Sequence, residues 1–482
     1  MNTNERWTPR VWGTLIVLCA ALFMDGLDLS MVGVTLPSIG HDLGMSTSAL
    51  QWVVSGYVLG YGGLLLLGGR AADLMGRREV FLVALGVFAA ASLFGGLVDS
   101  GGLVIASRFI KGASAAFTAP AALSLIVTTF PEGPQRNKAL GIFSATAASG
   151  FSLGLVISGL LTEIGWRWAF LLPFPIATIA LFAGIRLIPH QPAPPRAERR
   201  YDSAGAIVGT GSLSLLVYTV TQAADAGWGS ARTIGSLAGV VVMAVAFLII
   251  ESRSAAPLVR LGIFTNGNVS RANIGALLFF GAYTGFQFVL TLYLQDLLGW
   301  SALTVAMALL PSSLMVILGS TQMPRLFARF GPAKIMAGGF IAYVAGYALL
   351  LRIGLQTSYA PVLLPSVVLV GIGFVLCFSS STVAGTMNVR DEEQGLASGL
   401  VQTSLQIGGA IVLAVVTAVV TSGSHGAADA HGQLEGYRTG IAVVVGVALL
   451  GFVISLFGVI TEQRSRIAPH PESADAASLP VG

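Results

Sequence analysis

The stretch GRAADLMGRREVFL, residues 69–82, separates two long apolar runs of the chain. Gly69 and Gly76 allow a tight turn and a close helix approach, and Asp73 can accept hydrogen bonds from amides at the start of a helix. Three arginines of the same stretch can form ion pairs beside the turn: Arg70, Arg77 and Arg78. A merely basic loop would need neither glycine nor aspartate at these spacings. We therefore interpret the stretch as a latch between helices.

The composition is that of a membrane protein. The chain has 482 residues, of which 54% are hydrophobic and only 10% are charged, whereas soluble domains carry about 25% charged residues. Apolar runs of about 18 or more residues recur, each long enough to cross a bilayer as a helix. The net charge of +4 reflects loop residues that set topology and does not indicate nucleic-acid binding. The sequence predicts an all-α polytopic membrane protein.

Apolar runs and their Pro-, Gly- or charge-rich breaks predict fourteen transmembrane helices. We place these helices at 11–35, 48–69, 79–98, 102–129, 137–162, 167–189, 203–223, 232–251, 269–294, 301–323, 333–354, 359–387, 394–421 and 438–461. The longest Pro-rich charged break follows the sixth helix, and a second break follows the eighth. They divide the chain into an N-terminal six-helix bundle at 1–189, a linker with two extra transmembrane helices at 190–268, a C-terminal six-helix bundle at 269–461 and a cytoplasmic tail at 462–482.

The positive residues support this count. With the N-terminus inside, twenty of the 26 Lys and Arg residues fall on the cytoplasmic side, four fall outside, and Arg108 and Lys111 lie within a span. A missed helix would invert every later loop and destroy this asymmetry. We therefore expect a multi-pass protein of the plasma membrane with both termini in the cytoplasm.

Residues 69–82 resemble the Gly-x-x-x-Asp-x-x-Gly-Arg-Arg signature of the major facilitator superfamily. LDLSMVGVTLPSI (27–39), RFIKGASAAFTAPAALSLI (108–126) and GLASGLVQTSLQIGGAIVLAVV (395–416) resemble the first, fourth and thirteenth helices of its 14-span drug:proton antiporters. The resemblance implies the major facilitator fold, with six, two and six helices, and transport by alternating access. In such a transporter the 69–82 contacts form in one conformation and break in the other.

The fifth helix departs from the antiporter pattern of Gly-Pro followed by Gly-Gly. It reads GFSLGLVISGLL at 150–161, with Leu155 at the proline position. Its small residues are still expected to pack closely against another helix: Gly150, Gly154, Ser158 and Gly159. Because the missing motif is associated with antiport, an importer or facilitator remains an alternative. The corresponding turn in the second half, RLFARFGPAKIM (325–336), has Ala328 in place of the acid.

Four charged residues lie within the first and fourth predicted spans: Asp25, Asp28, Arg108 and Lys111. A rise of about 1.5 Å per residue places Asp28 level with Arg108, and Asp25 level with Lys111. An unpaired charge at this depth would cost several kcal/mol. The sequence thus predicts a ladder of two ion pairs. One alternative is that these are permanent pairs that only hold the helices together.

Such a ladder could couple proton movement to transport. A carboxylate that binds a proton when it faces outside and releases it inside would drive a substrate outward. By resemblance, Asp28 is the favoured proton carrier and Arg108 sets its proton affinity. The family pattern usually has an uncharged residue at position 25 and glutamine at position 111, so Asp25 and Lys111 depart from it with opposite charges.

The predicted function is proton-coupled export of small amphipathic compounds, as in multidrug and antibiotic efflux. Candidate substrate-cavity residues lie in the second half: Tyr283, Phe286, Gln287, Gln402 and Gln406. The expected partners are a small-molecule substrate, protons and membrane lipid, with no nucleic acid, and the expected state is a monomer. With no phosphate-binding loop, nucleophile or metal constellation in the sequence, we expect a non-enzyme powered by the proton gradient, without cofactor or metal. A small-solute importer or facilitator and a non-transporting membrane sensor are the alternatives.

Overall fold

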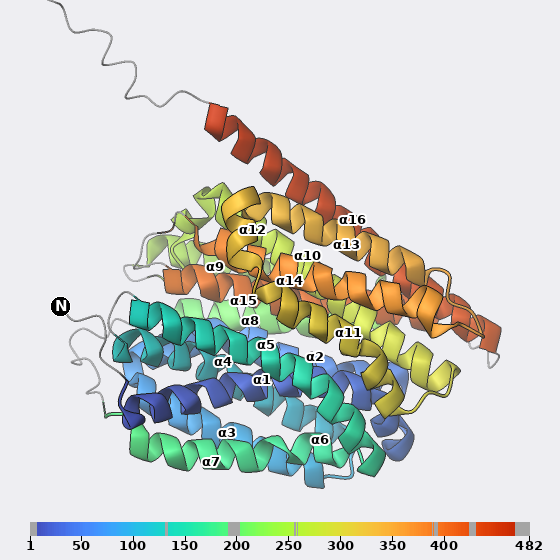
Figure 1. The fold of residues 1–482 in the computed structure, drawn as a ribbon, viewed down its shortest axis with the longest axis horizontal. Helices are drawn as coiled ribbons and strands as arrows, with labels where there is room; N and C mark the ends of the chain where they lie inside the picture. Colours follow the sequence, from blue (N-terminus) through green and yellow to red (C-terminus); the bar gives the residue numbers. More distant parts are fainter. Residues whose placement is uncertain are drawn as a thin grey trace, which may run out of the picture.

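The computed structural model describes residues 7–130, 134–190, 203–254, 257, 259–387, 389, 394–423 and 430–467. These residues form helices joined by short turns, without a β-strand among them (Figure 1). The helices of the first half are α1 (Pro9–Leu43), α2 (Thr47–Met75), α3 (Arg77–Leu97), α4 (Gly101–Thr129), α5 (Pro134–Ile164), α6 (Arg167–Leu171) and α7 (Pro173–Leu187). Then follow α8 (Ser203–Ala226), α9 (Ala231–Arg253), α10 (Gly267–Leu292), α11 (Ala302–Ser320), α12 (Met323–Phe330), α13 (Pro332–Leu350), α14 (Leu364–Thr386), α15 (Gln394–Gly423) and α16 (Ala430–Ile467).

Eleven helical segments among the described residues are long and apolar enough to cross a membrane. Helices α2, α5 and α8 are not among them, although they have 29, 31 and 24 residues. The chain is therefore a multi-helix membrane protein, and the predicted count of fourteen spans remains a prediction.

The helices form two groups that lie against each other. In Figure 1, α1–α7 occupy the lower part of the molecule and α10–α16 the upper part. Helix α8 packs against α2 of the first group and α15 of the second, and α9 packs on α8. These two helices correspond to the predicted extra spans at 203–223 and 232–251.

The two groups touch at the end of the bundle where α1 ends, which we call the Leu43 end. The opposite end, where α1 begins, is the Pro9 end. The Gln295 side chain donates a hydrogen bond from Nε2 to the Val34 carbonyl oxygen over 2.9 Å, and the Leu303 amide donates to Glu163 Oε1 over 3.3 Å. Helix α11 also packs along α5. The bundle is thus closed between its halves at the Leu43 end.

Two local features differ from the predicted helices. The predicted span at 167–189 is divided into α6 and α7 next to Pro173, which has no amide to continue the hydrogen-bond ladder. The predicted spans at 301–323 and 333–354 are separated by the short helix α12, which the hydropathy pattern missed. With eight residues, α12 is too short to cross a membrane.

Candidate functional site

Helix α1 carries two carboxyl groups into the protein interior. Its side chains are largely buried between α5, α7, α4 and α2. Asp25 is 8% exposed and Asp28 only 1%. Since the two residues are three apart, they lie on neighbouring turns of one helix face.

Both intramembrane cations of α4 bind the same carboxylate. Arg108 Nη1 pairs with Asp28 Oδ2, and Lys111 Nζ pairs with Asp28 Oδ1. The predicted separate pair between Asp25 and Lys111 is therefore not formed. A lysine side chain is about as long as one helical turn, so Lys111 can reach the neighbouring level. The result is a three-residue hub, Asp28–Arg108–Lys111, whose side chains are at most 1% exposed.

Further groups, which sequence reasoning missed, hold the two cations. Arg108 Nε donates to the Val53 carbonyl oxygen over 3.1 Å, and its guanidinium lies 4.5 Å from the centre of the Tyr57 ring. Lys111 Nζ lies 5.0 Å from the centre of the Phe88 ring and 5.5 Å from that of Phe170. Aromatic faces attract desolvated cations. The hub is thus supported by α2, α3 and α6 as well as α1 and α4.

Asp25 stands apart from the hub. Among the residues that the structure describes, none forms a hydrogen bond or ion pair with it, and its Oδ2 is buried without a partner. Tyr57, Tyr61 and Lys111 lie within electrostatic range of its carboxyl group. Buried polar atoms usually have partners, and exceptions often mark functional groups.

The hub depends on a close contact between α2 and α4. Gly112 lies directly against the Tyr57 backbone, where an added Cβ would be 2.8 Å from the Tyr57 carbonyl carbon. Gly60 has a similar position, with Ala113 N at 2.6 Å from an added Cβ. These glycines let the helices approach until Arg108 reaches Val53 and Tyr57.

A small central cavity lies between the two halves, next to the hub. Its volume is about 30 Å³, which is room for a water molecule or two but far below the volume of a drug-sized pocket. Its lining comes from α1, α2, α4, α10 and α15 and includes Leu29, Val32, Gly33, Leu36, Val54, Arg108, Phe280, Tyr283, Thr284, Gln287, Phe288 and Leu413. In this closed form Arg108 of the first half bounds one side of the cavity. Tyr283 and Gln287 of the second half lie on the other side.

The tentative substrate residues divide accordingly. Tyr283 and Gln287 line the central cavity, and Phe286, Gln402 and Gln406 do not. The Phe286 ring instead packs on Tyr347, with 5.3 Å between ring centres. Gln406 is buried where α15 meets α2, since an added Cβ at Gly62 would lie 3.1 Å from Gln406 Cβ.

The predicted latch is described only in part. The side chains of Arg70 and Asp73 are not among those that the structure describes. Gly69 lies in α2, and Gly76 joins α2 to α3 with φ of 104°, a conformation that favours glycine. Arg77 begins α3.

Arg78, at the start of α3, binds within the first half. Its Nη2 and Nε donate to the carbonyl oxygens of Ile185 and Ile188 over 2.8 and 2.9 Å. These carbonyl groups lie at the C-terminal end of α7, where the helix dipole favours a cation. Arg78 therefore joins α3 to α7.

The small residues of α5 lie where the predicted helix packing needs them. Gly150 and Gly154 face the α1 backbone, and Ser158 donates a hydrogen bond to the Met31 carbonyl oxygen over 2.7 Å. Gly159 faces the second half, where an added Cβ would lie 2.5 Å from Ala306 Cβ of α11. The stripe of Gly150, Gly154 and Ser158 thus packs on α1, and Gly159, nearer the C-terminal end of α5, packs on α11.

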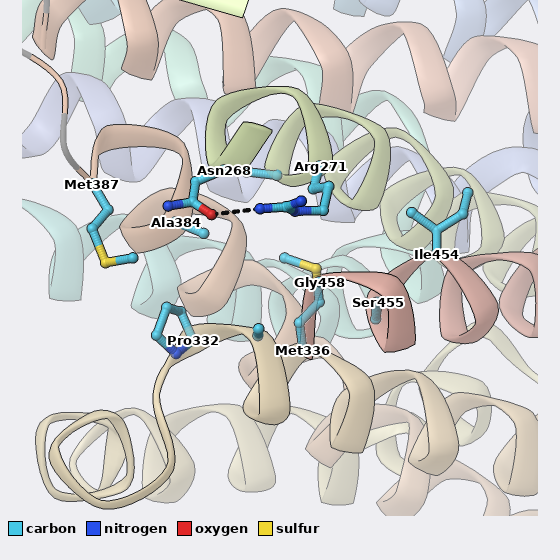
Figure 2. Close-up of a pocket in the computed structure, with 11 residues that line it drawn as sticks. Asn268, Arg271, Pro332, Met336, Ala384, Met387, Ile454, Ser455 and Gly458 are labelled. Carbon is cyan, nitrogen blue, oxygen red and sulfur yellow. Dashed lines mark hydrogen bonds between the residues drawn. The ribbon is translucent and has the colours of Figure 1, made fainter. Parts of the chain in front are cut away.

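A second cavity of about 40 Å³ lies within the second half, between α10, α13, α14 and α16 (Figure 2). Arg271 lines it and donates from Nη2 to Asn268 Oδ1 over 2.8 Å. None of the predicted site residues lines this cavity. It is separate from the charged hub.

Comparisons with known proteins agree with the fold. A model of the Major Facilitator Superfamily matches residues 18–413 and, again, 275–479. The chain is 37% identical to a puromycin resistance protein of Streptomyces alboniger, over 97% of this chain and 94% of that protein. It is 36% identical to a cephamycin export protein of Amycolatopsis lactamdurans, over 90% and 91%.

Among solved structures, the crystal structure of PepTSo, a transporter of the POT family, has a TM-score of 0.70 at 15% identity, and the match covers 95% of this chain and 99% of that one. At this identity the likeness concerns the fold alone. The match to the family model and the identity to full-length relatives lead to one conclusion: this chain belongs to the Major Facilitator Superfamily of membrane transporters.

Proposed function

We propose that this protein exports antibiotics and other small amphipathic compounds in exchange for protons. The relatives that carry this proposal are a puromycin resistance protein and a cephamycin export protein, each aligned over at least nine-tenths of its length. The energy source is the proton gradient, and the protein acts as a monomer without a cofactor.

The proposed topology has fourteen spans. Adding α2, α5 and α8, which have the required length, to the eleven apolar helices gives this number. The distribution of positive residues then places both termini in the cytoplasm, the Pro9 end on the cytoplasmic side and the Leu43 end on the outer side of the plasma membrane. The contacts at the Leu43 end correspond to a conformation closed to the outside.

The proposed coupling site is the group of four buried charges, Asp25 and the hub of Asp28, Arg108 and Lys111. With all four ionised their formal charges cancel. A proton that enters changes this balance and favours one conformation over the other, because buried unbalanced charge is costly. Tyr283 and Gln287, which share the central cavity with Arg108, would contact cargo when the cavity widens.

Everted membrane vesicles test this proposal. Their lumen is acidified, puromycin and a panel of other antibiotics and hydrophobic dyes are added, and proton release is followed with a pH-sensitive dye. Export in exchange for protons predicts compound-triggered proton release that is absent from vesicles lacking the protein. Proton movement in the same direction as the compound would instead support the importer, an alternative that Leu155 in place of the α5 proline leaves open. Binding without any flux would support a sensor.

A further inference from the structure

We propose that Asp25 is the residue that carries the coupling proton, and that Asp28 is a positioning residue that keeps Arg108 and Lys111 in place. This assignment rests on the proposed proton-coupled function and divides its four-charge site into two parts. It differs from the family resemblance, which favours Asp28 as the carrier.

Asp28 is poorly suited to exchange a proton in this arrangement. Both of its carboxylate oxygens are occupied, one by Arg108 and the other by Lys111. A proton on Asp28 would break two ion pairs at once and leave Arg108 and Lys111 without the carboxylate that both of them bind. Removing one partner of a buried ion pair is strongly unfavourable. The hub is therefore best maintained with Asp28 ionised throughout the cycle.

Asp25 can accept a proton without breaking any pair. Its Oδ2 has no hydrogen-bond partner among the described residues, and Asp25 is as a whole residue the most exposed of the four, at 8% against at most 1% for each hub residue. The groups facing it are Tyr57 and Tyr61 of α2, Lys111 of α4 and Asp28 of its own helix.

Helices α5 and α7, which also pack along α1, add no competing charge at this level. The one charged residue of α7, Arg186, lies in its last turn. Helix α5 has its described charged residues near its two ends, at Arg136, Lys138 and Glu163, whereas Gly150 and Gly154 face α1 beside the acids. Arg108 is held by Asp28, Val53 and Tyr57 instead. The charges that act on the Asp25 carboxyl group are therefore mainly those of Lys111 and Asp28.

The position of Asp25 suits proton release to the inside. It lies about 4.5 Å along α1 from Asp28, toward the Pro9 end, whereas the small central cavity extends from the hub toward the Leu43 end. In the outward-open state the Asp25 carboxylate binds a proton from outside and becomes a carboxylic acid. In the outward-closed state it releases the proton to the Pro9 side, which restores the carboxylate.

Infrared difference spectroscopy of the purified protein tests the assignment without any cargo. A pH change should produce the C=O stretching band of a buried carboxylic acid in the wild type. Asp25→Asn, which is nearly isosteric and breaks no ion pair, should lose this band, and Asp25→Glu should shift it. Glu435→Gln, which alters an acid that is 68% exposed on α16, should leave it unchanged. A band that persists in Asp25→Asn would overturn the proposal.

Transport by proteoliposomes gives a second, independent test, with labelled puromycin as the probe. Exchange of puromycin across the membrane needs no net proton movement, whereas accumulation driven by a pH gradient does. Asp25→Asn should retain exchange and lose accumulation, and Asp25→Glu should restore accumulation. Loss of both in Asp25→Asn, or normal accumulation, would overturn the proposal. If the wild type itself neither exchanges nor accumulates puromycin, puromycin export fails as a function, while the infrared band still decides the role of Asp25.

Discussion

Gly112→Ala should separate α2 from α4 and disrupt the charged hub. The added Cβ would lie 2.8 Å from the Tyr57 carbonyl carbon, and ordinary contact begins at 3.4 Å. The two backbones must therefore move apart by at least 0.6 Å, because the obstructing atoms are main-chain atoms that cannot rotate away. Overpacking of this kind costs about 1–3 kcal/mol. The same shift would lengthen the 3.1 Å hydrogen bond from Arg108 to Val53.

Thermal unfolding in detergent and puromycin exchange in proteoliposomes measure the two effects. Gly112→Ala should unfold at a lower temperature and lose most of its exchange activity. Gly338→Ala in α13 is the matched control, since an added Cβ there meets no atom within 4 Å and helix propensity alone should stabilise it by about 0.5–1 kcal/mol. A Gly112→Ala protein as stable and as active as the control would refute the claim that the α2–α4 contact positions Arg108.

Three further substitutions probe other contacts. Lys111→Gln removes one of the two cations on Asp28 and should strengthen binding of the cationic dye ethidium several-fold, measured by fluorescence polarisation. Unchanged binding would show that the charge of the hub does not affect cargo binding. Gln295→Leu removes the hydrogen bond to Val34, worth about 1 kcal/mol, and should raise the outward-open population about fivefold. Labelling of a cysteine introduced at Leu36 reports this opening, because both natural cysteines are buried, and an unchanged rate would contradict it. Arg78→Gln removes two hydrogen bonds to the end of α7 and should destabilise the first half by about 1–3 kcal/mol, measured by thermal unfolding. It should leave proton-to-substrate coupling unchanged, and altered coupling would argue for a latch role instead.

The helical architecture could be predicted from sequence because bilayer-spanning helices require long apolar runs. The predicted span at 102–129 corresponds to α4 at Gly101–Thr129, and the one at 394–421 to α15 at Gln394–Gly423. Helix α12 was missed since an eight-residue amphipathic helix has no such run.

The site was predicted less completely. Counting the rise along α1 and α4 brought the acids and cations to the same depth, and Arg108 and Asp28 do meet. The depth count could not identify the partner of Lys111, because depth along the helix does not show where a long side chain points. Phe88 and Phe170 were missed for a similar reason, since their contact with Lys111 depends on how α3 and α6 pack against α4.

The second-half residues show the same limit. Tyr283 and Gln287 are four apart and share one face of α10, which lines the central cavity. Phe286 is about 100° around the helix from Gln287 and packs on Tyr347 instead. Aromatic and amide composition therefore indicated the right helix, and only the packing of α10 shows which face meets the cavity.

The most direct test of the account is whether a proton gradient alone drives substrate uphill through the purified protein. Proteoliposomes containing the wild type are given an acidic lumen, and accumulation of labelled puromycin and a panel of related antibiotics is measured with and without a protonophore. Proton-coupled export predicts accumulation in the acidic lumen that stops when the protonophore collapses the gradient. Transport of these compounds down their own gradients, unaffected by the protonophore, would contradict it.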